Sequence, residues 1–344
     1  MDVAGLPFKK WNETLDKRQH SRAFAHAKLL LFGEHAAVYG FPAIGLPLPS
    51  KLTITVSTYN DSLNEDSDWQ YENVAPAHIP AVNELVKKLQ ILIPDFQTIK
   101  TGKMTIASDI IPGVGLGSSA ALCVALVKAV VGLFPYLEAD PRQIWNWAHQ
   151  CEHVFHGSPS GIDTGLAFHE RFCAFQPING NLPRFEYLNN LKLYLLIGVL
   201  QRNSNTKELI TQLKDSMQHN DEIKKSIWKL GRLARVAIDQ LTDNNKHLHK
   251  SIGELALEAH VHLSRLGLST PEQDLIIEAG MKEGASGGKL SGAGGGGVFF
   301  LVAEDYNHLM NLKDRLNSFS ELLPPHSKPL LKAVIWENEC PRFV

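Results

Sequence analysis

The chain has 344 residues, of which 44% are hydrophobic and 20% are charged, and its 34 basic and 36 acidic residues give a formal net charge of −2. This composition is typical of a globular protein with one or two domains, and it excludes a disordered or collagen-like chain. A near-neutral chain without a run of basic residues is not expected to bind nucleic acid, because that affinity depends on neutralising phosphates.

Neither the cysteines nor the apolar segments indicate a secreted or membrane protein. The four cysteines are far apart in the sequence, so we expect no disulfide scaffold and no cysteine-rich zinc site. The longest apolar stretch, 120–134, contains Lys128 and is shorter than the roughly 20 residues that a membrane helix needs. Residues 1–20 are interpreted as a polar extension, because they lack the apolar run of a signal peptide. We therefore expect a cytoplasmic protein with no membrane partner.

The first 200 residues alternate between strand and helix patterns. Short runs of apolar and β-branched residues predict strands at 28–32, 51–58, 104–108, 172–176 and 193–200. Helical spacing predicts helices at 81–93, 120–133 and 140–156. The last of these helices has Asp140 as its N-cap before Pro141, and Gly157 is expected just beyond its end. Polar and acidic residues at 60–73 predict a hairpin loop.

The rest of the chain is richer in helical patterns. Amphipathic spacing runs through 205–266, and Thr270 with Gln273 forms the capping box of a further helix. We also predict a strand at 298–302, a helix at 305–319 and a strand at 330–336. Strands concentrated in the first half and helices in the second predict an α+β fold rather than a doubly wound sheet. A boundary near residue 190 gives two domains of ordinary size, 1–190 and 191–344.

The 26 glycines are unevenly distributed, with three at 113–117 and eight at 284–297. The first cluster leads into the helix predicted at 120–133. Glycine lets the backbone approach a ligand closely, and the free N–H groups of a helix N-terminus bind anions. One of Ser118 and Ser119 can cap this helix while the other hydroxyl binds a phosphate or Mg²⁺. We therefore predict a di- or triphosphate site, with a plain glycine turn and a serine cap as the alternative.

Known nucleotide motifs do not describe this first cluster. The Rossmann pattern G-x-G-x-x-G fails, because Ser118 stands at the third glycine position counted from Gly113. The Walker A pattern fails, because Gly288-Lys289 is followed by Leu290. The H-R-D and D-F-G signatures of protein kinases are absent. The cluster is therefore predicted to be a phosphate loop of another kind.

The second glycine cluster lies directly before the apolar strand predicted at 298–302. Four successive glycines, 294–297, lose more backbone entropy on folding than a simple turn requires. Apolar residues border the cluster closely on both sides. We interpret it as a second backbone wall against the ligand, with a flexible linker as the alternative.

Two carboxylates between the clusters come from different local structures. Glu152 lies near the end of a predicted helix, and Asp163 follows a Ser-Pro-Ser-Gly turn. Such a pair can divide the work, one binding a metal and the other facing a substrate hydroxyl, although a surface helix residue and a turn residue are the alternative. His149, His153 and His156 have the spacing of one helix face. No H-E-x-x-H motif accompanies them, so we do not predict a zinc site.

Together these segments resemble the GHMP small-molecule kinases. The three signature regions of that family occur in the family's order, at 28–40, 112–121 and 289–297, and the resemblance spans about residues 22–302. The first region, K-L-L-L-F-G-E-H-A-A-V-Y-G, is most similar to the mevalonate kinase branch. Galactokinases carry G-E-H-T-D-Y and phosphomevalonate kinases usually carry G-E-Y at this place. Departures from the branch pattern are mild: Ala37, Ser158 and Ser291 replace the usual Val, Asn and Thr.

The resemblance implies a two-domain fold and an activity. The N-terminal domain would resemble domain 2 of ribosomal protein S5, and the C-terminal domain would be ferredoxin-like. The enzyme would use ATP and Mg²⁺ to phosphorylate the 5-hydroxyl of mevalonate, which gives 5-phosphomevalonate and ADP for isoprenoid biosynthesis. The alternatives are another GHMP kinase, acting on phosphomevalonate or a sugar, and a non-catalytic ligand sensor on the same fold. The oligomeric state is left open, with a homodimer as one alternative.

The resemblance also implies roles for individual residues. Asp163 would be the catalytic carboxylate with Lys28 beside it, and Ser119 and Glu152 would hold Mg²⁺. The nucleotide phosphates would lie against Pro112, Gly113, Gly115, Gly117, Ser118, Ser119 and Ala120. Mevalonate would lie against Glu34, His35, Thr206, Gly292 and Ala293.

Overall fold

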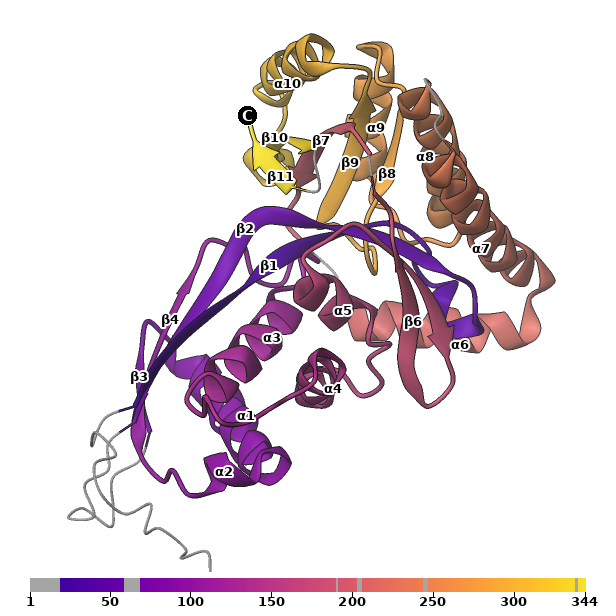
Figure 1. The fold of residues 1–344 in the computed structure, drawn as a ribbon. Coiled ribbons are helices and arrows are strands. Elements are labelled where there is room, and N and C mark those ends of the chain that lie inside the picture. The colour runs from indigo at the N-terminus through magenta and orange to yellow at the C-terminus, as the bar shows by residue number, and fades with distance from the viewer. Residues whose placement is uncertain (1–18, 59–68, 190, 203–205, 244–246, 338–339) are drawn as a thin grey trace, which may run out of the picture.

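The computed structural model describes residues 19–58, 69–189, 191–202, 206–243, 247–337 and 340–344. Two sheets with helices packed on them make up this part of the chain, which confirms the predicted α+β fold (Figure 1). None of the described helices is long and apolar enough to cross a membrane. All four cysteines are free, and only Cys340 is exposed.

The larger sheet comes from the first half of the chain and has six strands. They are β1 (His20–Phe32), β2 (Ala43–Thr58), β3 (Gln70–Glu72), β4 (Gly102–Ser108), β5 (Cys173–Ile178) and β6 (Asn181–Tyr187). β1 pairs antiparallel with β2 along nearly its whole length, while β4 and β5 pair with opposite ends of β2 along its other edge. β3 pairs with β4 and not with β2, so the hairpin predicted at 60–73 is wrong. Residues 59–68 of that loop lie outside the described part.

Five helices lie together on one side of this sheet (Figure 1). They are α1 (Ile79–Leu92), α2 (Pro94–Gln97), α3 (Ser118–Val131), α4 (Pro141–Glu152) and α5 (Ile162–His169). α3 packs on β1 and β2 and is buried on nearly all sides, as its almost uniformly apolar sequence predicts. Asp140 caps α4 by accepting a hydrogen bond from the Arg142 N–H, as predicted. The predicted end of α4 near His156 is wrong, because the helix stops at Glu152.

The smaller sheet comes from the second half and has the strand order β11-β10-β7-β9-β8. Its strands are β7 (Leu193–Val199), β8 (Gly287–Leu290), β9 (Val298–Ala303), β10 (Leu330–Glu337) and β11 (Cys340–Phe343). The sequence predicted β7, β9 and β10, which are central in the sheet, and missed its two edge strands. β8 reads Gly-Gly-Lys-Leu and β11 is four residues long, so neither carries an apolar alternation that sequence alone can detect.

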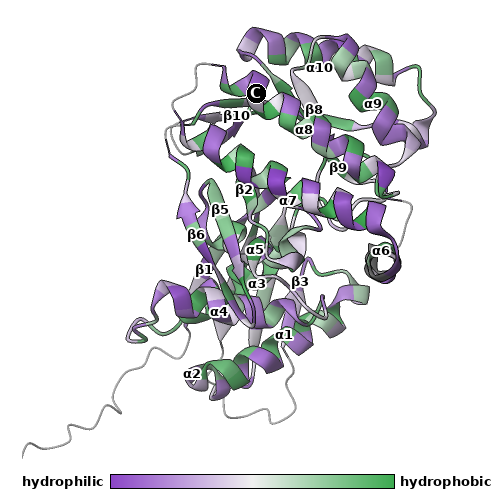
Figure 2. Cartoon of the chain, turned by 90° about the vertical axis from the view of Figure 1, so that its right-hand side faces the viewer, coloured by the Kyte–Doolittle hydropathy of each residue, from purple (hydrophilic) through white to green (hydrophobic). Residues whose placement is uncertain are grey.

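Helices of the second half cover this sheet and reach the first one. They are α6 (Thr206–His219), α7 (Asp221–Thr242), α8 (Leu248–Arg265), α9 (Pro271–Lys282) and α10 (Tyr306–Ser320). The described residues also form three short 3-10 helices: η1 (Ala37–Tyr39) and η2 (Pro76–His78) in the first half and η3 (Pro325–Ser327) in the second. The capping box at Thr270 is formed as predicted. α7 shows separate hydrophilic and hydrophobic residues in Figure 2, and its buried side includes Ile227, Leu230 and Leu233.

The two sheets share one continuous hydrophobic core. The ring of Phe172, just before β5, meets the ring of Trp336 on β10 at 5.8 Å between centroids. β11 also lies beside β2, and α7 packs against β1 and β2. Along the chain, the last strand of the larger sheet ends at Tyr187 and the first strand of the smaller sheet begins at Leu193. This junction is where we placed the domain boundary, which remains a proposal.

Candidate active site

A cavity of about 380 Å³ lies where the two glycine clusters meet. Its walls come from β1, the turn after β1, the loop before α3, the start of α5 and the loop after β8. The predicted site residues that line it are Lys28, Glu34, His35, Gly113, Gly115, Gly117, Ser118, Ser119, Asp163, Gly292 and Ala293. Tertiary structure therefore brings together segments that are up to 265 positions apart in the sequence.

Three of the predicted residues, Pro112, Ala120 and Glu152, do not line this cavity. Pro112 is exposed at the start of the loop, and Ala120 is fully buried inside α3. Glu152 lies behind Ser119, which it contacts through a hydrogen bond. Thr206 begins α6, and its side chain lies outside the described residues.

The first glycine cluster forms a tight loop over the N-terminus of α3. Gly113, Gly115 and Gly117 have φ angles of 78°, 100° and 76°, a left-handed backbone that L-residues rarely adopt. A Cβ on Gly117 would lie 2.7 Å from Cγ of Lys28, so glycine is also needed there for close packing. Gly117 is the N-cap, and α3 begins at Ser118 without a side-chain cap. The predicted serine cap is therefore wrong, and both hydroxyls belong to the first turn of an uncapped, anion-attracting helix end.

Ser119 and Glu152 form a hydrogen-bonded pair behind this loop. The Ser119 hydroxyl donates to Oε1 of Glu152 at 2.8 Å. Glu152 is 2% exposed, and burial raises its pKa to about 7, helped by the charge of Asp163 and opposed by the Ser119 hydrogen bond and Lys28. Its Oε2 atom is buried and has no hydrogen-bond partner within the part of the chain that the structure describes. A buried carboxylate with an unused oxygen beside a hydroxyl fits a divalent cation, which would supply the missing partner.

No larger metal cluster accompanies this pair. Among the residues that the structure describes, no group of three His, Cys, Asp or Glu side chains could hold a metal ion. Mg²⁺ does not need one, because it commonly keeps several waters and binds one or two protein oxygens together with substrate phosphates. The residues present therefore fit Mg²⁺ delivered with a nucleotide.

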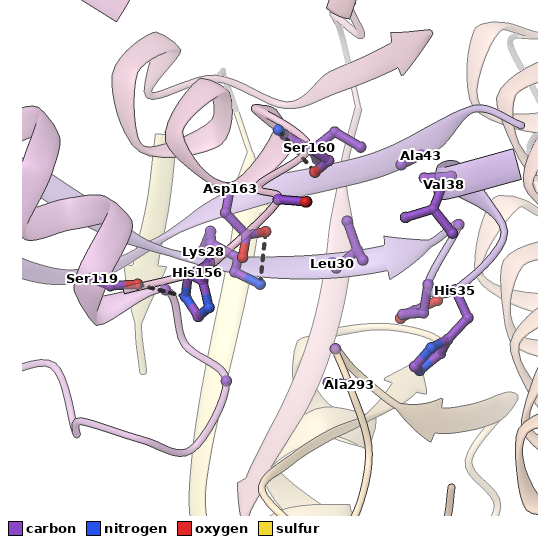
Figure 3. Close-up of a pocket in the computed structure, with 18 of the residues that line it drawn as sticks. Lys28, Leu30, His35, Val38, Ala43, Ser119, His156, Ser160, Asp163 and Ala293 are labelled. Atoms are coloured by element: carbon purple, nitrogen blue, oxygen red, sulfur yellow. Dashed lines mark hydrogen bonds and ion pairs between the residues drawn. The ribbon is translucent and has the colours of Figure 1, made fainter. Parts of the chain in front are cut away.

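Lys28 and Asp163 face each other at the centre of the cavity (Figure 3). Nζ of Lys28 lies 3.1 Å from Oδ1 of Asp163. The lysine side chain is 4% exposed, whereas the aspartate side chain is 47% exposed. Asp163 lies in the first turn of α5, which the sequence did not predict as a helix. The lysine is thus fixed, and the carboxylate can reach a ligand in the cavity.

The deeper end of the cavity is organised by a buried ion pair between the two sheets. Lys289 on β8 contacts Oε1 of Glu34, just after β1, and also donates to the Leu290 carbonyl at 2.7 Å. Both side chains are almost completely buried. Burial raises the pKa of Glu34 and lowers that of Lys289, while their mutual attraction opposes both changes. His35 is half-buried in the cavity wall, and loss of solvent lowers its pKa to about 4. Its Nε2 atom has no hydrogen-bond partner among the described residues.

The second glycine cluster packs against the first half of the chain. The Ser291 hydroxyl donates to the Leu30 carbonyl at 2.8 Å, and the Val298 N–H donates to the Val114 carbonyl at 3.2 Å. A Cβ on Gly297 would lie 2.4 Å from that same Val114 oxygen. The cluster is therefore an ordered wall, which excludes the flexible linker that the sequence left open.

Two basic residues at the site, Arg202 and Lys289, had no role predicted from the sequence. Arg202 lines the cavity from the end of β7, and its Nη1 donates to the Gly113 carbonyl at 3.0 Å. Its Nε and Nη2 atoms are buried without partners in the described part of the chain. Two unused buried donors beside a glycine loop point to an anionic ligand. Lys289 begins the third family region, 289–297, but its burial, like that of Arg202, is revealed only by the tertiary fold.

Comparisons with known proteins agree with this geometry. The family model for the GHMP kinases N terminal domain matches residues 79–170, and the model for the GHMP kinases C terminal matches residues 237–322. Mevalonate kinase from Thermococcus sibiricus is 30% identical over 82% of this chain and 89% of its own length. Mevalonate kinase from Pyrococcus abyssi is 31% identical over 82% of this chain and 88% of its own length.

Solved structures show the same fold. The crystal structure of L. major mevalonate kinase in complex with R-mevalonate has a TM-score of 0.76 at 20% identity and covers 95% of this chain and 98% of its own. A Streptococcus pneumoniae phosphomevalonate kinase has a TM-score of 0.72 at 18% identity and covers 95% of this chain and 100% of its own.

The fold, the helix-capping glycine loop and the Lys28–Asp163 pair define a small-molecule kinase. The matched relatives narrow this class further. The chain belongs to the mevalonate kinases of the GHMP kinase family.

Proposed function

We propose that the protein transfers the γ-phosphoryl group of ATP to the 5-hydroxyl of mevalonate, giving 5-phosphomevalonate and ADP. The observation that carries the proposal is the position of Asp163 and Lys28 beside the glycine loop of α3, in one cavity. An acceptor hydroxyl next to Asp163 would face a phosphate held by the loop. Phosphoryl transfer requires such positioning and compensation of negative charge, and little covalent chemistry by the protein.

Asp163 and Lys28 act on the acceptor hydroxyl. Asp163 accepts the hydroxyl proton or orients that hydroxyl, because its carboxylate is exposed to the cavity. Lys28 favours the developing alkoxide and compensates charge on the transferred group, since its buried ammonium is held within 3.1 Å of the carboxylate. Glu34, His35, Gly292 and Ala293 form the mevalonate side of the cavity. Thr206 remains a predicted substrate contact.

The glycine loop and the start of α3 bind the nucleotide. Backbone N–H groups at Gly113, Gly115 and Gly117 and the first turn of the helix bind the phosphates. Ser119 and Glu152 hold Mg²⁺, which when bound neutralises phosphate charge. We add Arg202 to this end, because a phosphate oxygen would satisfy its two unpaired donors.

Two other functions were left open by the sequence. A non-catalytic ligand sensor does not require all four of Lys28, Ser119, Glu152 and Asp163, yet these residues form two interacting pairs at one cavity. Another GHMP kinase activity is the closer rival, since phosphomevalonate kinases and galactokinases share the fold. The relatives at 30 to 31% identity favour mevalonate. A homodimer remains a prediction.

The test is a comparison of acceptors with the purified full chain, ATP and Mg²⁺. ADP release is measured with mevalonate, phosphomevalonate, galactose and homoserine, and the product is identified by mass spectrometry. We expect turnover with mevalonate to exceed that with each other acceptor. Preferred turnover of phosphomevalonate or a sugar would assign the protein to another GHMP activity, and no turnover of any acceptor would favour the sensor.

A further inference from the structure

His156 is the one of the three clustered histidines that lines the active-site cavity. It lies in the turn after α4, four residues beyond Glu152. Its Nε2 atom is 3.4 Å from the Ser119 hydroxyl and 3.4 Å from Oε1 of Glu152. Figure 3 shows the ring beside Ser119, on the same side of the cavity as Lys28 and Asp163. The side chain is 55% exposed. Its position therefore differs from that of a core histidine.

A helix-like turn after α4 explains how His156 reaches this place. The His156 N–H donates to the Glu152 carbonyl at 3.0 Å, the spacing of one more helical turn beyond the end of α4. Residues four apart on such a turn lie on the same side, so His156 follows Glu152 toward Ser119. His153, at the C-cap, is exposed and lies against His149 at 5.5 Å between ring centroids. Only one of these two neighbouring histidines thus approaches the Ser119–Glu152 pair.

The Ser119–Glu152 pair has few contacts that fix the orientation of its two side chains. The hydroxyl has a single proton, which it donates to Oε1 of Glu152. A cation bound between the two groups would be coordinated by oxygen lone pairs of both. Apart from the Ser119 hydrogen bond and the nearby His156 ring, no described contact of Glu152 fixes the angle of its carboxylate. Side chains that bind metals are usually oriented by an outer hydrogen bond. Nε2 of His156 is placed to donate one to the Ser119 hydroxyl, which in turn holds Glu152.

We propose that His156 is a positioning residue for the metal site: its Nε2–H donates to the Ser119 hydroxyl oxygen and holds the Ser119–Glu152 pair in the geometry that binds the nucleotide's divalent cation. The inference rests on the proposed function, since it takes Ser119 and Glu152 as the cation ligands. It assigns the imidazole tautomer with the proton on Nε2, because the Ser119 hydroxyl already gives its single proton to Glu152. His156 itself contacts neither the metal nor the phosphates.

The experiment measures metal binding directly, so it does not depend on turnover. Mn²⁺ is titrated into the full chain with a non-hydrolysable ATP analogue, and free Mn²⁺ is followed by electron paramagnetic resonance. We expect His156→Phe to weaken Mn²⁺ binding by about 10- to 100-fold, the usual effect of losing an outer-shell partner. His156→Gln should recover most of the affinity, because its amide carries an N–H donor at a similar distance from the backbone. His153→Phe is the matched control and should bind Mn²⁺ as the wild type does.

A second measurement separates orientation of the ligands from direct contact. Affinity for the analogue in EDTA should be the same in His156→Phe and in the wild type, and the KM for mevalonate should not change. Equal loss of metal-free nucleotide binding would overturn the proposal in favour of a phosphate contact. Wild-type Mn²⁺ affinity in His156→Phe, or failure of His156→Gln to recover it, would also overturn it. Failure of the wild type to phosphorylate mevalonate would instead refute the proposed function and leave the Mn²⁺ comparison valid.

Discussion

Two lysine–carboxylate pairs, one at the centre of the cavity and one at its buried end, differ in exposure. Lys289 and Glu34 are both buried, whereas Lys28 is buried and its partner Asp163 is 47% exposed. The buried pair joins β8 of the smaller sheet to the turn after β1 of the larger one. The half-exposed pair joins β1 to the start of α5 and opens toward the ligand.

This difference separates a structural use of charge from a chemical one. A buried pair has no water to replace a lost partner, so removing one member leaves an uncompensated charge. A half-exposed pair contributes little to stability, because solvent screens it and hydrates the remaining group. The exposed carboxylate is instead free to exchange its lysine contact for a substrate hydroxyl. Exposure, rather than the residue types, therefore decides which pair organises the cavity and which one acts in it.

The strongest test of the exposed end is Asp163→Asn. This change keeps the shape of the side chain and removes the negative charge that accepts the hydroxyl proton. We expect kcat with mevalonate to fall by about 10² to 10⁴-fold, the usual contribution of a general base. Affinity for the ATP analogue, measured by calorimetry, should be kept because the glycine loop is untouched. Wild-type turnover in this variant would remove Asp163 from the mechanism.

The strongest test of the buried end is Lys289→Met. Glu34 would keep a buried carboxylate without a partner, so the free energy of unfolding should fall by about 3–5 kcal/mol. The double variant Lys289→Met/Glu34→Gln should be more stable than Lys289→Met, since the unpaired charge is gone. Lys28→Met is the comparison at the exposed end. Its unfolding free energy should change by no more than about 1 kcal/mol, while its turnover is lost. Urea unfolding measures all three, and equal destabilisation by the two lysine variants would contradict the distinction.

A pH test addresses the buried end through His35. The folded protein holds His35 neutral with a pKa of about 4, whereas an unfolded histidine titrates near 6.5. Between these values the unfolded state binds more protons, so stability is full above pH 6.5 and falls as the pH drops toward 4. The loss is at most about 1.4 kcal/mol per pH unit.

His35→Gln should remove this pH dependence. Between pH 6.5 and pH 5, the wild type should lose about 2 kcal/mol more unfolding free energy than the variant. His20→Gln, at the exposed start of β1, is the control and should follow the wild type. Parallel curves for the wild type and His35→Gln would show that His35 is not held neutral by the fold.

The smallest expected effect compares two glycines of the first cluster. Gly117→Ala and Gly113→Ala both place an L-residue at a φ near 77°, which costs about 1–2 kcal/mol. Only the Cβ at 117 meets Lys28, at 2.7 Å, because the Cβ at 113 has no atom within 4 Å. We expect Gly117→Ala to lose more stability than Gly113→Ala and to have a lower kcat. Equal kcat values would show that the packing of Gly117 against Lys28 does not position the lysine.

The sequence predicted most central elements because their signals are local. The strand at 298–302, the capping box at Thr270 and the apolar helix at 120–133 were all confirmed within a few residues. The edge strands β6, β8 and β11 were missed, since β8 and β11 are only four residues long and β6 contains Pro183, so none carries a clear strand pattern. The end of α4 was misplaced for a related reason: Gly157 is a sound local stop signal, but the turn begins at His153.

The sequence by itself determined the family, the glycine loop and the two carboxylates, because glycine spacing and motif order are properties of the chain. Tertiary structure alone decided how these residues are used. It placed Arg202 at the cavity and Lys289 beside Glu34, buried Glu34 while leaving Asp163 exposed, and turned His156 toward Ser119. Burial and the distance between residues far apart in the chain set pKa and charge pairing, and no local pattern encodes either quantity.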